Sequence, residues 1–372
     1  MPWGKCGIIS YMNERQDIRT SEELLAALPE PLLRWYRANA RDLPWRHTDD
    51  PYRIWVSEIM LQQTRVAAVL GYYARFLAAL PSVEALAAAP EDQLMKLWEG
   101  LGYYSRARNL HRAARIIVDR GGFPDTYEGL LALPGIGDYT ASAIASACFG
   151  RREAAVDGNV LRVVTRLTDC HDDILAPQTK RRIRAQLQAV MPERGPDIRL
   201  FNQAAMELGA TVCAPNGPPR CGECPAADLC LGRLRGTAEA LPVKAPQKER
   251  RIEHRTVFLL LRGGSVALRR RPNTGLLAGL WEFPGAEGTL DETQAAETVA
   301  AWGLQPKAWR RKLTAKHIFT HVEWHMDGYV LEVAGEGPGD FVWVNRAALE
   351  DHAVPSAFAR YYAEAKEQME RE

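Results

Sequence analysis

Features that would direct this chain to a membrane or to secretion are missing from its 372 residues. No apolar run approaches the roughly 20 residues that span a bilayer, and the opening residues, MPWGKCGIISYMNERQ, lack the apolar core of a signal peptide. Net charge is also nearly absent, since 47 Lys and Arg balance 46 Asp and Glu. A binding site for a polyanion must therefore be a local patch, and we expect a cytoplasmic protein with no membrane partner.

Cysteine is sparse outside one short segment. The chain has seven cysteines, an odd number, and four of them, Cys213, Cys221, Cys224 and Cys230, are bunched together. In a chain without a leader, such bunching favours metal binding over disulfides. A zinc ribbon usually shows two C-x-x-C pairs and only one is present here, so we favour a cubane iron–sulfur cluster, with zinc as the alternative.

The length suggests two or three domains, and the sequence pattern changes along the chain. Residues 1–21 are an extension without an assignable role, and residues 22–235 are expected to form an all-α domain that includes the cysteine loop at 213–230. A linker with prolines and many charges follows at 236–254. Residues 255–372 change to the two-residue period of strands, with two helices, which predicts an α+β domain.

The expected elements are stated here by residue number. We expect an early amphipathic helix capped by Ser21 and a second helix that begins with Asp50 as N-cap and Pro51 as first residue. The C-terminal domain is expected to have strands at 255–262, 265–272, 316–333 and 341–345, and helices at 291–304 and from about Ser356.

An acid lies in the middle of the helix predicted after Pro51. Glu58 has mainly apolar neighbours at helical spacing in the stretch PYRIWVSEIMLQQT. A carboxyl group on such a face loses hydration when it ionises, so its pKa should rise, which suits a general acid near neutral pH. The polar residues Gln62, Gln63 and Thr64 follow and suit hydrogen bonding to bases. The alternative is a glutamate that reaches solvent or pairs with an arginine.

Two further stretches favour binding of nucleic acid. In LLALPGIGDYTASAIASACFG, Gly135 and Gly137 allow a tight turn whose N–H groups, with the dipole of the next helix, can bind a phosphate. An ordinary helix–turn–helix is the alternative. In LGYYSRARN, Tyr103 and Tyr104 precede a basic helix that contains Arg106. Aromatic and basic residues together are typical of a nucleic-acid surface, although a solvated charged face is the alternative.

A second acid stands at a predicted helix start. Asp157 precedes Gly158 and Asn159 in AAVDGNVLRV, as a helix N-cap would. A carboxylate there is stabilised by the helix dipole and should stay ionised. Cleavage of a glycosidic bond needs two such acids, because one protonates the leaving group and the other faces an oxocarbenium-like sugar. The alternative is an N-cap with no chemical role.

Together, SEIMLQQT with Glu58, the hairpin LPGIG, VDGN with Asp157 and the cysteine segment resemble the MutY family of adenine DNA glycosylases. This family belongs to the helix–hairpin–helix glycosylases, which include endonuclease III, and the resemblance runs from about residue 22 to the C-terminus. It implies excision of adenine mispaired with 8-oxoguanine in double-stranded DNA, a [4Fe–4S] cluster, and a C-terminal Nudix-like domain that recognises the oxidised guanine. It also implies a monomeric bacterial enzyme associated with the nucleoid.

The resemblance gives individual residues a role. Glu58 would protonate adenine, Asp157 would stabilise the cationic sugar, and Tyr139 and Asn159 would support these acids. Cys213, Cys221, Cys224 and Cys230 would hold the cluster. The implied contacts to DNA or to the flipped adenine are Trp45, Arg46, Leu61, Gln63, Thr64, Leu101, Gly102, Tyr103, Gly135, Gly137 and Gln203. In the C-terminal domain, Phe319, Thr320 and His321 stand where the family has Phe-Ser-His and would contact the damaged base.

One further departure from the family and two other candidate functions complete these expectations. The helix after GLWEFPG lacks the glutamate run of Nudix hydrolases, so the C-terminal domain is expected to bind and not to hydrolyse. The second candidate function is a bifunctional glycosylase/lyase for oxidised pyrimidines, which needs an amine nucleophile where this chain has Tyr139. The third is a non-catalytic iron–sulfur protein that binds DNA or senses redox state, against which Glu58 and Asp157 both argue.

Overall fold

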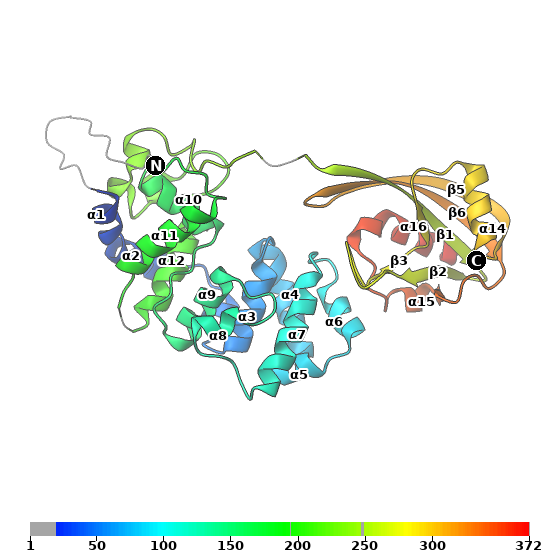
Figure 1. Ribbon diagram of the computed structural model, residues 1–372, viewed down its shortest axis with the longest axis horizontal. Helices are drawn as coiled ribbons and strands as arrows, with labels where there is room; N and C mark the ends of the chain where they lie inside the picture. The colour runs from blue at the N-terminus through cyan, green and yellow to red at the C-terminus, as the bar shows by residue number, and fades with distance from the viewer. Residues whose placement is uncertain (1–19, 194, 247–248, 372) are drawn as a thin grey trace. The chain divides into compact units, whose positions relative to one another are not determined.

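The computed structural model describes residues 20–193, 195–246 and 249–371 (Figure 1). The extension expected at 1–21 therefore lies outside the described residues, apart from Thr20 and Ser21. By its packing the chain divides into two compact units. The first comprises residues up to Val66 with 82–87 and 112–246, and the second comprises 67–81, 88–111 and 247–372.

The first unit consists of helices joined by short turns, as the sequence predicts. Its α-helices are α1 (Ser21–Ala26), α2 (Pro29–Asn39), α3 (Pro51–Leu61), α5 (Val83–Ala88), α8 (Tyr127–Leu131), α9 (Asp138–Phe149), α10 (Gly158–Leu167), α11 (Pro177–Val190), α12 (Asp197–Thr211) and α13 (Leu231–Leu234). Its 3-10 turns are η1 (Pro44–Arg46), η2 (Cys221–Glu223) and η3 (Ala227–Leu229).

Two helix starts test the capping predictions. Asp50 caps α3 as expected, since its side chain accepts a hydrogen bond from the Tyr52 N–H at 2.9 Å. The cap predicted at Ser21 is wrong, because Thr20 caps α1. Glu23 lies three residues after Thr20 and its carboxylate accepts from the Thr20 N–H, so the reciprocal capping box can close only around Thr20.

Helix α12 is central to the first unit and positions the residues of interest. It packs against α2 and α10, and α3 packs against α9. Leu32, Val160, Phe201 and Leu208 are among the buried side chains of this core. Burial of this apolar surface stabilises the arrangement, so residues distant in the sequence are held side by side on α2, α3, α9, α10 and α12.

The second unit contains α4 (Val66–Ala79), α6 (Glu91–Trp98) and a C-terminal domain built on one sheet; α7 (Ser105–Asp119) runs from this unit into the first. The strands are β1 (Arg251–Arg262), β2 (Ser265–Arg270), β3 (Trp281–Glu282), β4 (Gly285–Glu287), β5 (Gln305–Ile318), β6 (Val322–Ala334) and β7 (Phe341–Asn345). Their order is β3-β2-β1-β6-β5, while β4 pairs with β1 and β7 pairs with β2. The β1–β6 pair is parallel and the others are antiparallel.

Helices cover both faces of this sheet (Figure 1). Tyr361 and Ala365 of α16 (Ala359–Glu370) pack on one face, and Ala295 and Val299 of α14 (Glu292–Ala301) pack on the other. Two short helical segments, α15 (Arg346–Leu349) and η4 (Ser356–Phe358), precede α16. The expected α+β domain is therefore confirmed.

The stretch 316–333 is strand apart from its turn. It contains the end of β5 and most of β6, which pair antiparallel and are joined at Phe319–His321. Strand β5 also starts earlier than expected, at Gln305. The sequence did not indicate this first half, because its side chains are mostly exposed and show no clear apolar alternation.

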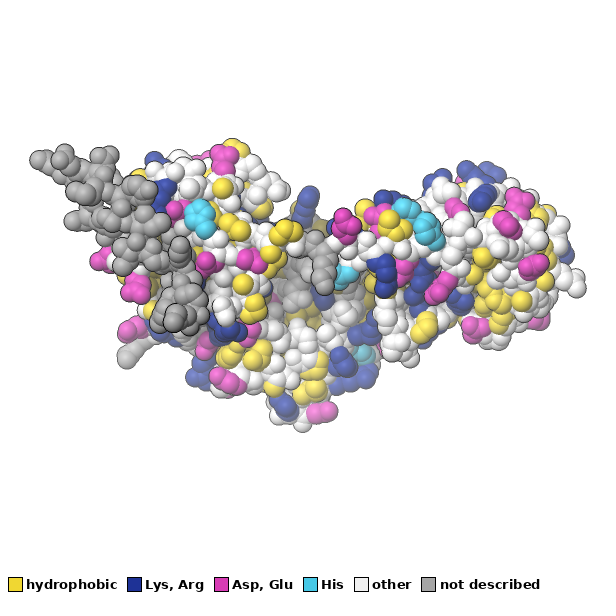
Figure 2. Space-filling model, turned by 45° about the horizontal axis from the view of Figure 1, so that its top comes forward, with side chains coloured by type: hydrophobic (Ala, Val, Ile, Leu, Met, Phe, Trp, Pro, Cys, Tyr) yellow, Lys and Arg dark blue, Asp and Glu magenta, His cyan; other side chains and the backbone are white. Residues whose placement is uncertain are grey.

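Charge is dispersed over the surface. Figure 2 shows Lys and Arg side chains interspersed with Asp and Glu over the visible face, in agreement with the net charge of +1. No helix among the described residues is long and apolar enough to cross a membrane.

Candidate active site

Glu58 faces Tyr139 across the contact between α3 and α9. The Tyr139 hydroxyl donates to Glu58 Oε2 at 2.7 Å and lies 3.1 Å from the sulfur of Met206. Burial raises the pKa of Glu58 to about 7; the Tyr139 hydrogen bond and the charge of Arg46 lower it, while the charge of Asp157 raises it. Glu58 can therefore carry a proton near neutral pH, as the apolar helix predicts.

Asp157 caps α10 as predicted, within a network of hydrogen bonds. Its two carboxylate oxygens accept from the Val160 N–H at 2.8 Å and from Asn159 Nδ2 at 2.7 Å. Burial raises the pKa of Asp157, while these hydrogen bonds and the charge of Arg162 lower it. Loss of hydration in a buried cap thus opposes the stabilisation that the helix dipole gives to its charge.

Asn159 is in turn held by Arg162. The Arg162 Nη2 donates to Asn159 Oδ1 at 2.7 Å and to the Gly209 carbonyl at 2.8 Å, and its Nε donates to the Cys213 carbonyl at 2.8 Å. One buried guanidinium group thus connects the Asp157–Asn159 pair to the first residue of the cysteine loop.

A small cavity opens beside Glu58. It is lined by side chains from the η1 loop and helices α3, α9 and α12, among them Trp45, Glu58, Gln203 and Met206. Its volume of about 20 Å³ is room for roughly one water, so a nucleobase can enter only if the lining moves. The sequence expectation that Trp45, Glu58 and Gln203 share one site is consistent with this lining.

The end of α3 presents a strained residue to solvent. Gln63 is exposed and has a φ of 57°, in the left-handed region that side chains rarely adopt. Its neighbours face inward: Gln62 donates to Thr140 Oγ1 at 3.3 Å, and the Thr64 hydroxyl donates to the Gln62 carbonyl at 3.3 Å. Gln62 therefore links α3 to α9, whereas the sequence suggested contact with bases. Leu61 is the last residue of α3.

The turn before α7 also has a left-handed backbone and an exposed side chain. Gly102 and Tyr103 both have positive φ, 68° and 47°, and the Tyr103 side chain is 46% exposed. The predicted basic helix carries Arg106, Arg108, Arg112 and Arg115. Arg106 is not on an exposed face of it, since Arg106 is buried and donates to the carbonyls of Leu101 at 3.0 Å and Gly102 at 3.2 Å. Its role is to hold the turn that exposes Tyr103.

The predicted hairpin joins α8 to α9. Gly135 has a φ of 77°, which a glycine adopts without strain, and Ile136 is buried between two exposed glycines. Gly137 is the N-cap of α9 and supplies no side-chain acceptor to the first-turn N–H groups. These N–H groups can therefore donate hydrogen bonds to an external anion.

The four cysteines lie close to one another at the edge of the first unit's core. Burial raises the pKa of the Cys224 thiol to about 12, and the charges of the three other cysteines of the loop add to the rise. Arg166 donates to Cys213 Sγ at 3.3 Å. Among the described residues, no three His, Cys, Asp or Glu side chains are grouped tightly enough to close on a single metal ion. A cubane differs in that each thiolate binds a different iron at its own corner.

The C-terminal domain presents the Phe319–His321 turn at the end of the β5–β6 pair. The Phe319 N–H donates to the Val322 carbonyl at 2.8 Å, and the Phe319 ring packs on Trp324 with centroids 4.9 Å apart. Thr320 and His321 are exposed. Phe319 thus anchors the turn, and the Thr320 hydroxyl lies 3.0 Å from the Tyr103 hydroxyl, within hydrogen-bonding distance.

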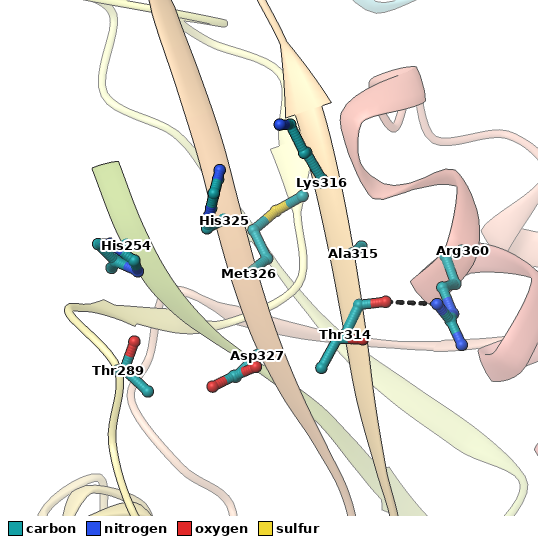
Figure 3. Close-up of a pocket in the computed structure, with 9 residues that line it drawn as sticks. All are labelled: His254, Thr289, Thr314, Ala315, Lys316, His325, Met326, Asp327 and Arg360. Carbon is teal, nitrogen blue, oxygen red and sulfur yellow. Dashed lines mark hydrogen bonds between the residues drawn. The ribbon is translucent and has the colours of Figure 1, made fainter. Parts of the chain in front are cut away.

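A larger cavity of about 560 Å³ lies on the same sheet (Figure 3). His254, His325 and Lys316 stand in register on β1, β6 and β5, and Glu323 pairs with both Lys316 at 2.5 Å and His325 at 2.6 Å. Asp327 is the one carboxylate among its lining residues. The two acids that influence each other, Glu58 and Asp157, lie in the first unit and not among the residues that line this cavity.

Comparison with known proteins agrees with this geometry. Residues 56–193 match the HhH-GPD superfamily of base excision DNA repair proteins, and residues 256–364 match the NUDIX domain. The chain is 35% identical to the human adenine DNA glycosylase, over 89% of this chain and 72% of that protein. The chain belongs to the adenine DNA glycosylase family.

Further members and a solved structure extend the likeness. The adenine DNA glycosylase of Buchnera aphidicola subsp. Baizongia pistaciae is 34% identical, over 68% of this chain and 72% of that protein. The structure of a thermostable thymine-DNA glycosylase is 29% identical with a TM-score of 0.52, and the match covers 58% of this chain and 99% of that one. The predicted fold, a helical glycosylase part followed by a Nudix-like domain, is confirmed.

Sequence reasoning missed several residues of this glycosylase site. Arg199, Met206 and Glu207 contribute from α12, and Tyr36 contributes from α2 by donating to Gln203 Oε1 at 3.0 Å. Their positions on α12 recur with the helical period around Gln203. That spacing was visible in RLFNQAAMELG and could have indicated them.

Proposed function

We propose that this protein hydrolyses the N-glycosidic bond of adenine mispaired with 8-oxoguanine in double-stranded DNA. The observation that carries the proposal is the protonatable Glu58, with a pKa of about 7, which accepts a hydrogen bond from Tyr139 and lines a small cavity that must open to admit a base. A charged Asp157 lies near enough to affect that pKa. Two acids with different environments are the arrangement that glycosidic cleavage uses.

Glu58 is the general acid in this scheme. Adenine leaves poorly as an anion, so a proton delivered to N7 as the C–N bond breaks lowers the barrier. The base must leave the stack to meet Glu58, because its leaving-group nitrogens are out of reach in a duplex. After departure the carboxylate of Glu58 can orient the attacking water.

Asp157 acts on the other side of the bond. Its carboxylate faces the positive charge that develops on the sugar, and Asn159 and the Val160 N–H fix its direction. The raised pKa found for Asp157 reflects a site without DNA; a cationic sugar beside it favours the charged form. Trp45, Arg46 and Gln203 are proposed to contact the flipped adenine.

DNA binding is assigned to three exposed features. Gln63 and Tyr103, both with left-handed backbone, are proposed to insert at the mispair, since strained exposed residues often mark functional sites. Gly135 and Gly137 are proposed to bind a backbone phosphate, with Leu61, Thr64, Leu101 and Gly102 shaping the adjoining surface. Thr320 and His321 would distinguish 8-oxoguanine from guanine.

The cysteine loop fits an iron–sulfur cluster. Cys213, Cys221, Cys224 and Cys230 have mutually interacting thiols, and the nearby Arg166 can balance thiolate charge. A [4Fe–4S] cluster held by these four would cross-link residues 213–230, the segment that follows α12. We further propose that the protein acts as a monomer in the bacterial cytoplasm.

Analysis of products tests the proposal. Full-length protein is incubated with duplexes that carry adenine opposite 8-oxoguanine, adenine opposite guanine, or an oxidised pyrimidine. We expect free adenine from the first two, faster from the first, and strand breaks only after alkali. Release of an oxidised pyrimidine with direct strand cleavage would favour the lyase, although none of the described residues lining the cavity is a lysine. Binding without release of any base would favour the non-catalytic alternative.

A further inference from the structure

The loop that carries Trp45 and Arg46 is held in place by α12. We propose that Glu207 is a positioning residue for adenine excision: through Arg41 and Arg46 it fixes this loop as one wall of the base-binding cavity. The inference rests on the proposed function, because it concerns how the same site receives its base.

The carboxylate of Glu207 is buried and accepts hydrogen bonds from two arginines. The Glu207 side chain is fully buried, and Oε1 accepts from the Arg41 N–H at 3.1 Å and from Arg41 Nε at 2.7 Å. Oε2 accepts from Arg41 Nη2 at 2.7 Å and from Arg46 Nη2 at 2.6 Å. Burial alone would raise the pKa of Glu207, but these hydrogen bonds lower it to about 2, so the carboxylate is charged at every working pH.

The second guanidinium, that of Arg46, connects this anchor to the cavity. Its Nη1 donates to the Arg41 carbonyl at 2.8 Å, and its carbon lies 5.3 Å from the centre of the Tyr36 ring. The Tyr36 hydroxyl donates to Gln203 Oε1. Glu207 therefore fixes Arg46, and Arg46 packs on the ring that orients Gln203, a residue of the cavity lining.

The backbone of the loop is fixed independently. Arg199, one turn before Gln203 on α12, donates to the carbonyls of Arg46 at 3.0 Å and Thr48 at 2.7 Å. Loss of Glu207 should therefore release the side chains of Arg41 and Arg46, while Arg199 still holds the backbone at Arg46 and Thr48. We expect displacement of the Arg46 side chain and not collapse of the whole loop.

The position of Arg46 has a consequence for the general acid. The groups that act on Glu58 are Tyr139 from α9, Asp157 from the start of α10 and Arg46 from the loop. The charge of Arg46 lowers the pKa of Glu58. If Glu207 no longer holds Arg46, that effect weakens and the alkaline limb of the pH–rate profile moves to higher pH. Removal of the negative charge of Glu207 with Arg46 unmoved would shift the limb the other way.

The test compares Glu207→Gln with Asp197→Asn in the full-length protein. Asp197 is the matched control, because it is also a carboxylate of α12 that pairs with an arginine, Arg37 of α2 at 2.5 Å, but on the exposed surface. Single-turnover release of adenine is measured across pH, with metal content and thermal midpoint as checks of folding. We expect Glu207→Gln to slow release about 10- to 100-fold and to move the alkaline limb of the pH–rate profile to higher pH. The rate of Asp197→Asn should stay within about twofold of wild type.

The result that overturns the inference is a Glu207→Gln enzyme with a wild-type rate, or with a slower rate but an alkaline limb that is unchanged or lowered. If Glu207→Gln does not fold, Arg41→Gln replaces it. Glu207 then keeps its charge and its hydrogen bond to Arg46, so the rate should fall less than about threefold. A loss as large as that of Arg46→Gln would contradict the claim that Glu207 acts on the site mainly by holding Arg46. Absence of adenine release by the wild-type protein would refute the proposed function. Failure of the positioning role is a different result, because the wild-type protein then releases adenine and Glu207→Gln does so equally fast.

Discussion

The Tyr139 hydroxyl donates to Glu58 Oε2 at 2.7 Å and thereby joins the helix after the hairpin to the helix of the acid. The same contact opposes burial, which raises the pKa of Glu58, and brings the net pKa to about 7. A glutamate that must both hold and release a proton is tuned by this balance. The segment after the hairpin therefore has a second role beside the phosphate binding proposed for it, because Tyr139 in the first turn of α9 influences the protonation of the acid.

Replacement of Tyr139 by Phe should separate these roles. The change removes the hydrogen bond that lowers the pKa of Glu58, so that pKa should rise and the protonated acid should persist to higher pH. In wild type, single-turnover excision should decline above about pH 7. In Tyr139→Phe the decline should begin at higher pH, while the maximal rate falls because Glu58 is less well oriented. A profile with an unmoved alkaline limb would mean that Glu58 is not the titrating acid.

Arg162→Gln should impair both the site and the cysteine loop. Arg162 donates to Asn159, Gly209 and the Cys213 carbonyl, so its loss leaves buried acceptors unpaired on both sides. We expect about a tenfold or greater loss of excision rate and a lower metal content. Arg152→Gln is the control, because Arg152 also donates to carbonyls, those of Ala189 and Met191, away from the site. Equal losses in the two variants would argue against a specific connection.

Gly209→Ala should displace Asn159 by a steric clash, without removing any hydrogen-bonding group. A Cβ at position 209 would lie 2.6 Å from Asn159 Cβ and 2.8 Å from its carbonyl oxygen, so α10 and α12 would have to separate. We expect a lower thermal midpoint and slower excision, because Asn159 supports Asp157. Gly339→Ala is the control, since a Cβ there meets nothing within 4 Å. Wild-type activity and stability in Gly209→Ala would show that this packing is not required.

The cysteine loop predicts the colour and metal content of the protein. Purified wild type should be yellow-brown and contain iron without zinc. Cys221→Ser should lose the metal and destabilise the region of the loop, whereas Cys170→Ser, a buried thiol outside the loop, should retain it. Zinc without iron in the wild-type protein would replace the cluster with the alternative that the sequence left open.

The elements that sequence predicted well are those set by local rules. The Asp50–Pro51 start of α3, the LPGIG turn and the Asp157 cap each follow from a few adjacent residues. The raised pKa of Glu58 was also predictable, because the apolar character of its own helix is visible in the sequence. Local patterns therefore located both acids.

What the sequence could not provide depends on distant partners. Arg46 and Glu207 are 161 positions apart, and their pairing requires α12 to pack beside the η1 loop. The burial that raises the pKa of Asp157 likewise arises from tertiary packing, which adjacent residues do not indicate. The left-handed backbone of Gln63 and Tyr103 likewise has no signal in residue type, because neither is a glycine.

The most direct test of the account is single-turnover release of adenine by wild type and Glu58→Gln at neutral pH, on a duplex with adenine opposite 8-oxoguanine. Glutamine keeps the shape but has no proton to transfer, so the variant should bind the duplex and lose about 10² to 10⁴-fold in rate. Thermal midpoint and metal content should match or exceed those of wild type, because a buried acid with a pKa of about 7 is replaced by a neutral group. A folded Glu58→Gln protein that retains more than about a tenth of the wild-type rate would contradict the assignment of Glu58 as the acid.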